Sequence, residues 1–468
     1  MPKFDELNWT DATTQAELVR NKEISPLELV EYTIERIEHL NPVLNAVITT
    51  MYDEALETAA SQLPDGPLAG VPFLVKDFLA EYAGIRFTES SNFLNDYVPE
   101  DDAELVKRWK SAGLIAIGKS NLPEMAIGAT TEPVRFGPTR NPWDTDRTPG
   151  GSSGGAAAAL ASGLCTLSQG SDGGGSIRIP SNFCGVYGIK PTLGRIPIYK
   201  SEDAVFVQNQ LGQPGPMSRT VLDSALLLQI LSGPDPIDPG SLRSSPPDFV
   251  AATIADVSGI RIGWSSDYGY ASVDKNVLEV TSKAAQTFEE LGCVIDPVDF
   301  SVGEPFDAFW NIFCANGFTR FGYLLDADTD ILTDYSRASL EHGRDVTGPV
   351  YAKSMGEIDQ LKYTFEDVFD KYDLLLSPVT SVPAFPVGKK PSQINGKEVH
   401  PWWGFFPFTY PINMIGCPAA SVPCGFSSEG LPIGLHIVGR RGEEETVLAA
   451  SAAFEKAKPW SGYLPSVS

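Results

Sequence analysis

The stretch "GSDGGGSIRIPS", residues Gly170–Ser181, contains three consecutive glycines that run directly into a serine. Glycine loses more conformational freedom on folding than any other residue, so three in a row are seldom selected for packing alone. Their backbone N–H groups have no side-chain cover, and such a run can hold an anion or a developing oxyanion. The stretch therefore indicates either a phosphate-binding turn or an acyl-transfer site with Ser176 as the nucleophile.

The glycine run does not match the motifs of nucleotide-binding loops. It lacks the lysine of G-x-x-x-x-G-K-[ST], and its spacing is not that of G-x-G-x-x-G. The G-x-S-x-G elbow of α/β-hydrolases does not surround Ser176 either. No histidine lies near Ser176 in the sequence, which weakens the case for a Ser-His-Asp triad. Acyl transfer with a different base is the better interpretation.

Three lysines at the ends of apolar runs are candidates for that base. Lys76 follows "VPFLV", Lys119 follows "IAIG" and Lys190 follows "VYGI". A buried lysine can lose its proton near neutral pH because burial disfavours the charged form. The alternative for each is a structural lysine at a strand end, either ion-paired or reaching solvent. Spacing and periodicity do not choose among the three.

The order of apolar patterns predicts an α/β protein. Ile24–Pro42 is a helix whose start is marked by Ser25, Pro26 and Glu28, an S-x-x-E capping box. "AGVPFLVKD" and "GLIAIGKSN" are predicted as buried strands around the helix-compatible "DDAELVKRWKSAG". That alternation is typical of parallel βαβ units. Further along, "PGGSSGGAAAALASG", "SRTVLDSALLLQILSG" and "VLEVTSKAAQTFEELG" are predicted helices, and "GIRIGW" and "YDLLLSPVT" are predicted strands.

Two segments are predicted to form no regular element. Ser232–Phe249, rich in Pro and Asp, is expected to be a long surface loop. His400–Tyr410, "HPWWGFFPFTY", is interrupted by prolines and rich in aromatic rings. It is either a core plug under a loop or the wall of a pocket for an apolar substrate.

Composition excludes several classes of function. The 468 residues carry a net charge of −25, which disfavours direct contact with nucleic acid or an anionic membrane. The N-terminus is polar and acidic, unlike a secretory signal, and we expect a cytoplasmic protein. The six cysteines and four histidines are scattered, so we expect buried thiols and neither a disulfide framework nor a metal site. No cofactor is expected.

The combination of motifs resembles the amidase signature family of serine amidohydrolases. The long signature runs from "PGGSSGGAAAALASG" through "GSDGGGSIRIPSNFCGVYGIKPTLGRIP". Further segments resemble the family in the family's order between about Leu68 and Arg441, namely "AGVPFLVKD", "GKSNLPEMA", "RNPWD", "GPMSRTVLDSALLL", "YDLLLSPV" and "GLPIGLHIVGRR". The resemblance implies a single α/β domain, with a large, mixed, mostly parallel sheet flanked by helices on both faces. We expect residues 1–65 to be an N-terminal helical segment, 66–200 the signature core, and 201–468 the rest of the sheet, its covering helices and the pocket loops.

The resemblance also implies a Ser–cis-Ser–Lys catalytic triad. Ser176 matches the nucleophile, Ser152 the bridging serine after a cis peptide bond, and Lys76 the base. Lys119 and Lys190 match family lysines outside the triad. The family's oxyanion hole corresponds to Gly173, Gly174, Gly175 and Ser176. Asp172 and Arg178 match residues that support this loop; Ser153 is interpreted mainly as a helix cap, and Ser171 as a hydrogen-bonding member of the loop.

The family resemblance leaves the substrate open. The aromatic segments Phe306–Asp326 and His400–Tyr410 predict a pocket for an apolar or aryl group beside the amide, and the candidate lining residues are Met125, Trp310, Cys314, Trp403 and Phe406. The reaction implied is hydrolysis of a small-molecule amide through a Ser176 acyl-enzyme. The alternatives are a urethane, ester or nylon-oligomer hydrolase, or the A subunit of an ATP-dependent glutamyl-tRNA amidotransferase. That subunit often has threonine at the position of Gly173 and serine at that of Ala156, and many family members have glutamine at that of His436. A homodimer is compatible with the sequence.

Overall fold

The computed structural model describes residues 7–198, 210–326 and 332–468. The boundary drawn between residues 200 and 201, and the first six residues of the expected N-terminal segment, lie outside this part of the chain. Within it the architecture is a single α/β domain built on a large mixed sheet. A small separate hairpin is formed by β10 (Gln393–Ile394) and β11 (Lys397–Glu398).

The central sheet has 11 strands. In order across the sheet they are β1 (Val47–Thr50), β3 (Ile115–Ser120), β2 (Pro72–Lys76), β4 (Leu167–Asp172), β6 (Gln213–Ser218), β5 (Tyr187–Lys190), β12 (Ala419–Phe426), β13 (Pro432–Gly439), β9 (Leu374–Pro378), β7 (Arg261–Trp264) and β8 (Val294–Pro297). The expected parallel pairing is present in two blocks, β3–β2–β4 and β9–β7–β8. The strands between these blocks pair antiparallel, as does the edge strand β1.

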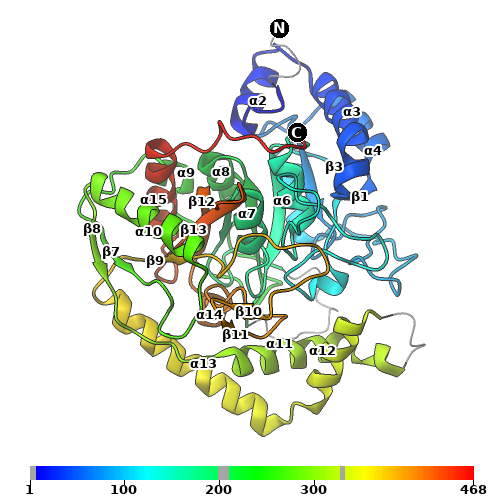
Figure 1. The fold of residues 1–468 in the computed structure, drawn as a ribbon. Coiled ribbons are helices and arrows are strands. Elements are labelled where there is room, and N and C mark those ends of the chain that lie inside the picture. The colour runs from blue at the N-terminus through cyan, green and yellow to red at the C-terminus, as the bar shows by residue number, and fades with distance from the viewer. Residues whose placement is uncertain (1–6, 199–209, 327–331) are drawn as a thin grey trace.

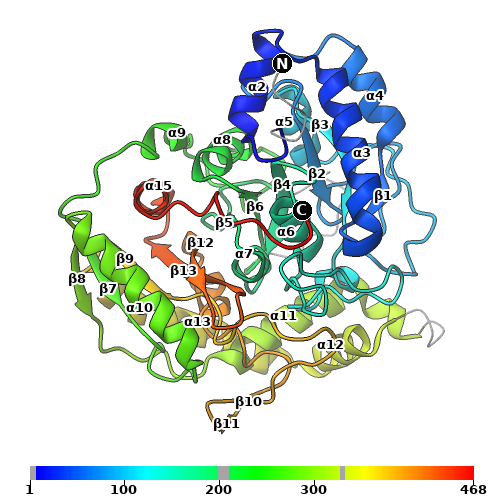
Figure 2. The same cartoon turned by 45° about the horizontal axis from the view of Figure 1, so that its top comes forward.

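Helices cover both faces of the sheet. They are α2 (Ala12–Arg20), α3 (Pro26–Leu44), α4 (Tyr52–Ala60), α5 (Glu104–Ser111), α6 (Gly154–Ala161), α7 (Arg178–Cys184), α8 (Val221–Leu231), α9 (Phe249–Ala252), α10 (Lys275–Glu290), α11 (Phe306–Phe321), α12 (Asp334–Asp345), α13 (Gly348–Phe369), α14 (Tyr410–Ile415) and α15 (Glu444–Ala457). Two short 3₁₀ turns, Glu124–Ala126 and Gly322–Asp326, complete the described elements. In Figure 1, α11, α12 and α13 lie together along one side of the molecule. Figure 2 shows α3 and α4 beside β1 at one end and α10 beside β7–β9 at the other.

Strands inside the sheet, such as β2, are buried on both faces because alternate side chains enter different cores. On β2, Phe73 and Val75 belong to a core shared with α5, α8 and α15. Leu74 belongs to a second core, which contains the alanines of α6. A third, strongly aromatic core contains residues of α11, α13 and α14. This alternation decides which way the last residue of each strand points.

The patterned elements form where the sequence predicts them. Helix α3 begins with the predicted capping box of Ser25 and Glu28, but it continues through Pro42 to Leu44. The βαβ unit β2–α5–β3 is present and parallel. Residues His400–Thr409 contain no helix or strand, and α14 starts at Tyr410. Among the described residues, no helix is long and apolar enough to cross a membrane.

Candidate active site

Lys76 is the last residue of β2, and its side chain lies on the sheet face that α6 covers. Strand alternation places Lys76 on the same side as Leu74, which packs in the α6 core. The Lys76 side chain is fully buried. Its Nζ donates hydrogen bonds to Ser152 Oγ at 2.7 Å, Ser171 Oγ at 2.9 Å and Ser153 Oγ at 3.0 Å. Three hydroxyls from two segments therefore surround one amine.

Burial lowers the pKa of Lys76 to about 7, although the carboxylates of Asp172 and Glu89 pull it upward. The three nearest side-chain partners are neutral hydroxyls, and none of the ion pairs in the described residues includes Lys76. A neutral hydroxyl stabilises the ammonium form less than a carboxylate does, so the desolvation cost of the charge is not recovered. A sizeable neutral fraction near pH 7 makes Lys76 chemically able to accept a proton.

Ser152 and Ser153 are presented by the glycine-rich turn before α6. The Gly151–Ser152 peptide bond is cis. A Cβ on Gly151 would come within 2.9 Å of the Thr130 backbone, which explains glycine there. Ser153 stands at the N-cap of α6, but its side chain makes no capping hydrogen bond. The cap interpretation of Ser153 is therefore wrong, because its Oγ accepts from Lys76 Nζ instead.

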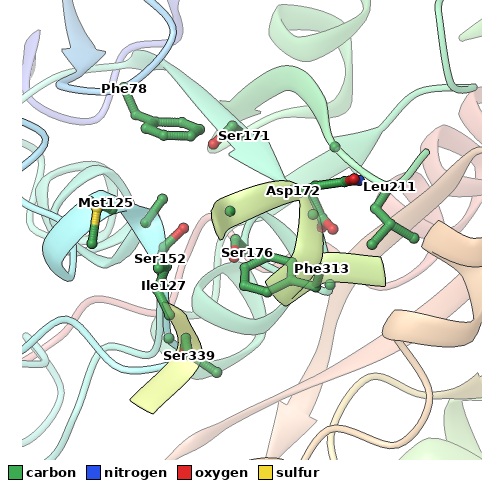
Figure 3. Close-up of a pocket in the computed structure, with 18 of the residues that line it drawn as sticks. Phe78, Met125, Ile127, Ser152, Ser171, Asp172, Ser176, Leu211, Phe313 and Ser339 are labelled. Carbon is green, nitrogen blue, oxygen red and sulfur yellow. The ribbon is translucent and has the colours of Figure 1, made fainter. Parts of the chain in front are cut away.

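Ser176 follows the glycine run at the end of β4 and lines the same cavity as Ser152. Figure 3 shows both serine side chains facing this cavity, with Ser171 and Asp172 also around it. The N–H groups of Gly173, Gly174 and Ser176 have no hydrogen-bond acceptor among the described residues. The N–H of Gly175, in contrast, donates to Asp172 Oδ1 at 2.7 Å. The Gly175 N–H is therefore already used within the loop. Of the four N–H groups expected to bind an oxyanion, those of Gly173, Gly174 and Ser176 remain free within the described part of the chain.

The glycines at 174 and 175 are required by close contacts with Phe309 and Thr409. A Cβ on Gly174 would come within 2.8 Å of Phe309 Cζ, and a Cβ on Gly175 would overlap Thr409 Oγ1. Gly175 also has φ +135°, which L side chains rarely adopt. Thr409 Oγ1 donates to Gly174 O at 2.7 Å. The loop is thus held from outside by a residue of the aromatic segment.

A buried ion pair holds the glycine loop from inside. Arg178 Nε and Nη2 donate to the two carboxylate oxygens of Asp172, each at 2.9 Å, and both side chains are fully buried. Although burial opposes it, the Arg178 guanidinium holds the pKa of the Asp172 carboxyl well below its usual range. Asn413 Nδ2 donates to Asp172 O at 3.0 Å and to Asp172 Oδ1 at 2.9 Å. The loop conformation is therefore fixed by charge-assisted hydrogen bonds.

His436 completes this support on the neighbouring side of Arg178. Arg178 Nη1 lies 3.0 Å from His436 Nε2, and arginine has only donors, so Nε2 must accept. The proton is then on Nδ1, which lies 3.3 Å from Ser377 Oγ. Burial, followed by the Arg178 charge, lowers the pKa of His436 well below its ordinary value. His436 is a neutral acceptor for Arg178, a role that its sequence position did not reveal.

The cavity beside Ser176 has a volume of about 190 Å³ and is mainly apolar. Of the five candidate lining residues, Met125, Cys314, Trp403 and Phe406 line it. Trp310 does not. It faces a second cavity on the other side of Trp403, since the two indole rings pack with centroids 4.6 Å apart. Helical spacing explains the difference, because Phe309 and Phe313 occupy the α11 face that meets the glycine loop.

The other two candidate lysines lie away from this cavity. Lys119 is buried 3.2 Å from Asp77 Oδ1 and donates to Arg86 O at 2.8 Å. Lys190 is buried and donates to Pro191 O at 2.9 Å. Burial, followed by the Arg178 charge, lowers the pKa of Lys190 to about 7, as for Lys76. The pKa alone does not separate these two lysines; only Lys76, among the three, bonds to a serine that lines the cavity.

Several site residues have no motif in the sequence. Asn413 and Thr409 lie more than 230 residues from the glycine loop along the chain. No spacing rule links such distant positions, so only the fold could have found them. The structure also shows no group of His, Cys, Asp and Glu side chains suited to a metal ion in its described part.

Comparison with known proteins gives a consistent result. The family described as Amidase matches residues 28–448. The acylamidase of Rhodococcus erythropolis is 36% identical over 470 residues, covering 98% of each chain. The A subunit of the glutamyl-tRNA(Gln) amidotransferase of Carboxydothermus hydrogenoformans is 37% identical over 484 residues, covering 96% of this chain and 98% of the relative. A solved bacterial aryl acylamidase of the amidase signature family superposes with a TM-score of 0.91 at 36% identity, covering 97% of each chain.

Proposed function

The chain belongs to the amidase signature family, and on that premise we propose that it hydrolyses a carbon–nitrogen amide bond through an acyl-enzyme on Ser176. The observation that supports this most is the 2.7 Å hydrogen bond from Lys76 Nζ to Ser152 Oγ, at a cavity that also contains Ser176. It joins a base with a sizeable neutral fraction near pH 7 to a hydroxyl that can pass on a proton.

The reaction begins with two proton transfers. Ser152 Oγ gives its proton to the neutral Lys76 amine and takes the proton of Ser176 Oγ, while the Ser176 oxygen bonds to the amide carbon. In the described residues no hydrogen bond joins Ser152 Oγ to Ser176 Oγ, so this step requires the two hydroxyls to come together when substrate binds, as is common for catalytic contacts. The negative carbonyl oxygen is held by the free N–H groups of Gly173, Gly174 and Ser176.

Breakdown of this intermediate releases the amine and then the acid. The proton held by Lys76 returns through Ser152 to the leaving nitrogen, and the carbon–nitrogen bond breaks. Water then attacks the Ser176 ester, giving its proton to the same relay, and the carboxylic acid leaves as Ser176 recovers its hydrogen. Asp172 and Arg178 act as positioning residues, because their hydrogen bonds to each other and to the Gly175 N–H hold the loop.

The cavity wall supports apolar or aryl amides as substrates. Phe309 and Phe313 from α11 meet Trp403 and Phe406 from the aromatic segment, and Phe309 packs on the glycine run. Aromatic walls bind flat apolar groups by area burial and ring contacts. The relative from Rhodococcus erythropolis is described as an acylamidase and the solved neighbour as an aryl acylamidase, which agrees with such a pocket.

A panel of amides tests the proposal. Anilides with acetyl, hexanoyl and benzoyl groups, acetamide, and matched esters and urethanes are each given to the wild-type protein and to Ser176→Ala. We expect kcat/KM to be highest for the aryl and longer-chain amides, and Ser176→Ala to lose at least about a thousandfold. Equal activity of the two proteins would refute the Ser176 assignment. Acetamide turning over best would refute the apolar pocket, and esters or urethanes turning over best would favour a different hydrolase on the same residues.

A second function is favoured by one observation, the 37% identity between the chain and the A subunit of a glutamyl-tRNA(Gln) amidotransferase. Such a protein would release ammonia from glutamine and work with partner chains. Glutamine as the sole substrate, together with stoichiometric partner chains on purification from the native host, would favour this function. Anilide hydrolysis by the isolated chain would favour the first.

A further inference from the structure

One face of α11 forms a stripe along the cavity, from the glycine loop to the last turn of the helix. Phe309, Phe313, Asn316, Gly317 and Arg320 all line the cavity, with the spacing of a single helical face. Phe309 marks the catalytic end because it packs against Gly174. With a rise of about 1.5 Å per residue, Arg320 lies roughly 16 Å further along the helix axis.

Gly317 leaves space in the middle of this stripe. Glycine inside a helix costs about 1 kcal/mol relative to alanine, so a mid-helix glycine calls for a local reason. A Cβ at Gly317 would meet only Leu340 Cδ2, at 4.0 Å, so close packing against a neighbour does not exclude a side chain here. The missing side chain instead widens the cavity between Phe313 and Arg320. A chain extending from the glycine loop has room to pass over Gly317.

Arg320 brings a positive charge to this end of the cavity. Asp172 and Arg320 are the two charged side chains that line it in the described part of the chain, and Asp172 is neutralised by Arg178. Arg320 forms no ion pair or hydrogen bond within that same part, and its guanidinium lies 4.9 Å from the Phe321 ring. The whole protein carries a net charge of −25, yet Arg320 has no acidic partner among the described residues. Its planar fork of donors suits a carboxylate.

From these observations we infer that the enzyme takes elongated amides whose far end carries a carboxylate, with the apolar chain over Gly317 and the carboxylate on Arg320. This inference rests on the proposed amide hydrolysis and adds the substrate class. The carboxylate can belong to the acyl group or to the amine. Both kinds of amide are therefore included in the test.

The test compares pairs of anilides that differ only at the far end of the acyl chain, which is either methyl or carboxylate, over a series of chain lengths. A second set carries the carboxylate on the amine side. For the best chain length we compare kcat/KM for the carboxylate-ended anilide with kcat/KM for the methyl-ended one. We expect this ratio to fall about threefold to tenfold in Arg320→Gln. That range lies between the usual effect of losing an exposed ion pair and that of losing a charged hydrogen bond. The ratio should also fall with added salt, because the site is exposed. Arg344→Gln, an exposed arginine that does not line the cavity, is the matched control and should keep the wild-type ratio.

Gly317→Leu provides an independent variant, because leucine favours the helix and fills the space that the chain would use. It should lower kcat/KM for long acyl chains about tenfold more than for acetyl. The inference is overturned if Arg320→Gln keeps the wild-type ratio at every length on both sides of the amide. If the wild type hydrolyses no anilide, the proposed function fails first. Calorimetric binding of the carboxylate-ended anilide to Ser176→Ala, with and without Arg320→Gln, then decides the inference, and equal affinities or no binding would overturn it.

Discussion

Lys76 and Lys119 lie on neighbouring parallel strands, and both are fully buried, yet they have different surroundings. The register pairs Lys119 with Val75, so the two lysines point to opposite faces of the sheet. Lys119 meets the Asp77 carboxylate at 3.2 Å, whereas Lys76 meets three serine hydroxyls. Burial lowers the pKa of Lys119 too, but Asp77 opposes this shift.

The difference between the two sites shows that burial alone does not make a lysine a base. An adjacent carboxylate stabilises the ammonium and turns the residue into one half of a structural ion pair. Hydroxyl partners leave the amine free to change its charge and supply a path for the proton. Substitutions at the two lysines, and then in the glycine loop, test whether the hydroxyl and carboxylate partners account for this difference.

Replacing each lysine by methionine should separate catalysis from stability. Lys76→Met should lower kcat by about a hundredfold to ten-thousandfold, because the base is lost. Lys119→Met leaves Asp77 buried without its partner and should lower the free energy of unfolding by about 3–5 kcal/mol. The folded fraction of Lys119→Met should keep kcat within a few fold, and adding Asp77→Asn should recover part of the stability. Steady-state kinetics and denaturant titrations measure both effects; the account fails if Lys119→Met loses activity as Lys76→Met does.

Alanine substitutions in the glycine run should differ sharply between adjacent positions. Gly174→Ala would drive a Cβ to 2.8 Å from Phe309 and displace an oxyanion donor, so we expect kcat to fall about a hundredfold to a thousandfold. The nearest side-chain atom to a Cβ on Gly173 is in Phe313, at an ordinary 3.8 Å, and this variant should lose less than about tenfold. Circular dichroism checks that both variants fold. Equal losses would contradict the crowding seen at Gly174.

The pH profile should report the deprotonation of Lys76. Because burial lowers the pKa of Lys76 to about 7 and the neutral amine is the active form, kcat/KM should rise with pH through about 7. Below that value it should fall about tenfold for each pH unit. Asp77→Asn changes the charge beside Lys119 and should leave this midpoint in place. A profile flat from pH 5 to pH 8 would argue against Lys76 as the titrating base.

Thr409 should have the smallest effect of the four. Thr409→Val removes the hydrogen bond to Gly174 O while nearly keeping the shape, and we expect kcat to fall about threefold to tenfold with a smaller change in KM. Thr409→Ser keeps the hydroxyl and should recover most of kcat. A rise in KM with kcat unchanged, or no recovery of kcat in Thr409→Ser, would mean that Thr409 acts in the pocket wall and does not position the glycine loop.

Much of the fold could be predicted from the sequence, because its signals are local. The capping box of Ser25 and Glu28 marks the start of α3, and the apolar runs before Lys76 and Lys119 are strands. The parallel direction of β2 and β3 follows from the helix between them. The antiparallel pairing in the middle of the sheet is harder to predict from the sequence, because long-range pairing leaves no periodic signal in a single strand.

The candidate site shows the same division between local and long-range information. The glycine run marked a group of N–H donors, but the capture of Gly175 N–H by Asp172 depends on a loop conformation that composition does not reveal. Aromatic character alone predicts Trp310 at the cavity, whereas the helical phase of α11 turns Phe309 and Phe313 there instead. Periodicity did not choose among the three buried lysines; the family resemblance did, and the contacts of Lys76 agree with it.

The most direct test of the account is to identify the residue that carries the acyl group. The wild-type protein is mixed with an activated aryl ester or anilide, quenched within one turnover and digested, and the acylated peptide is sequenced by mass spectrometry. We expect the acyl mass on Ser176, with none on Ser152 and none in Ser176→Ala. An acyl group on Ser152 or on any residue other than Ser176, or full turnover by Ser176→Ala, would contradict it.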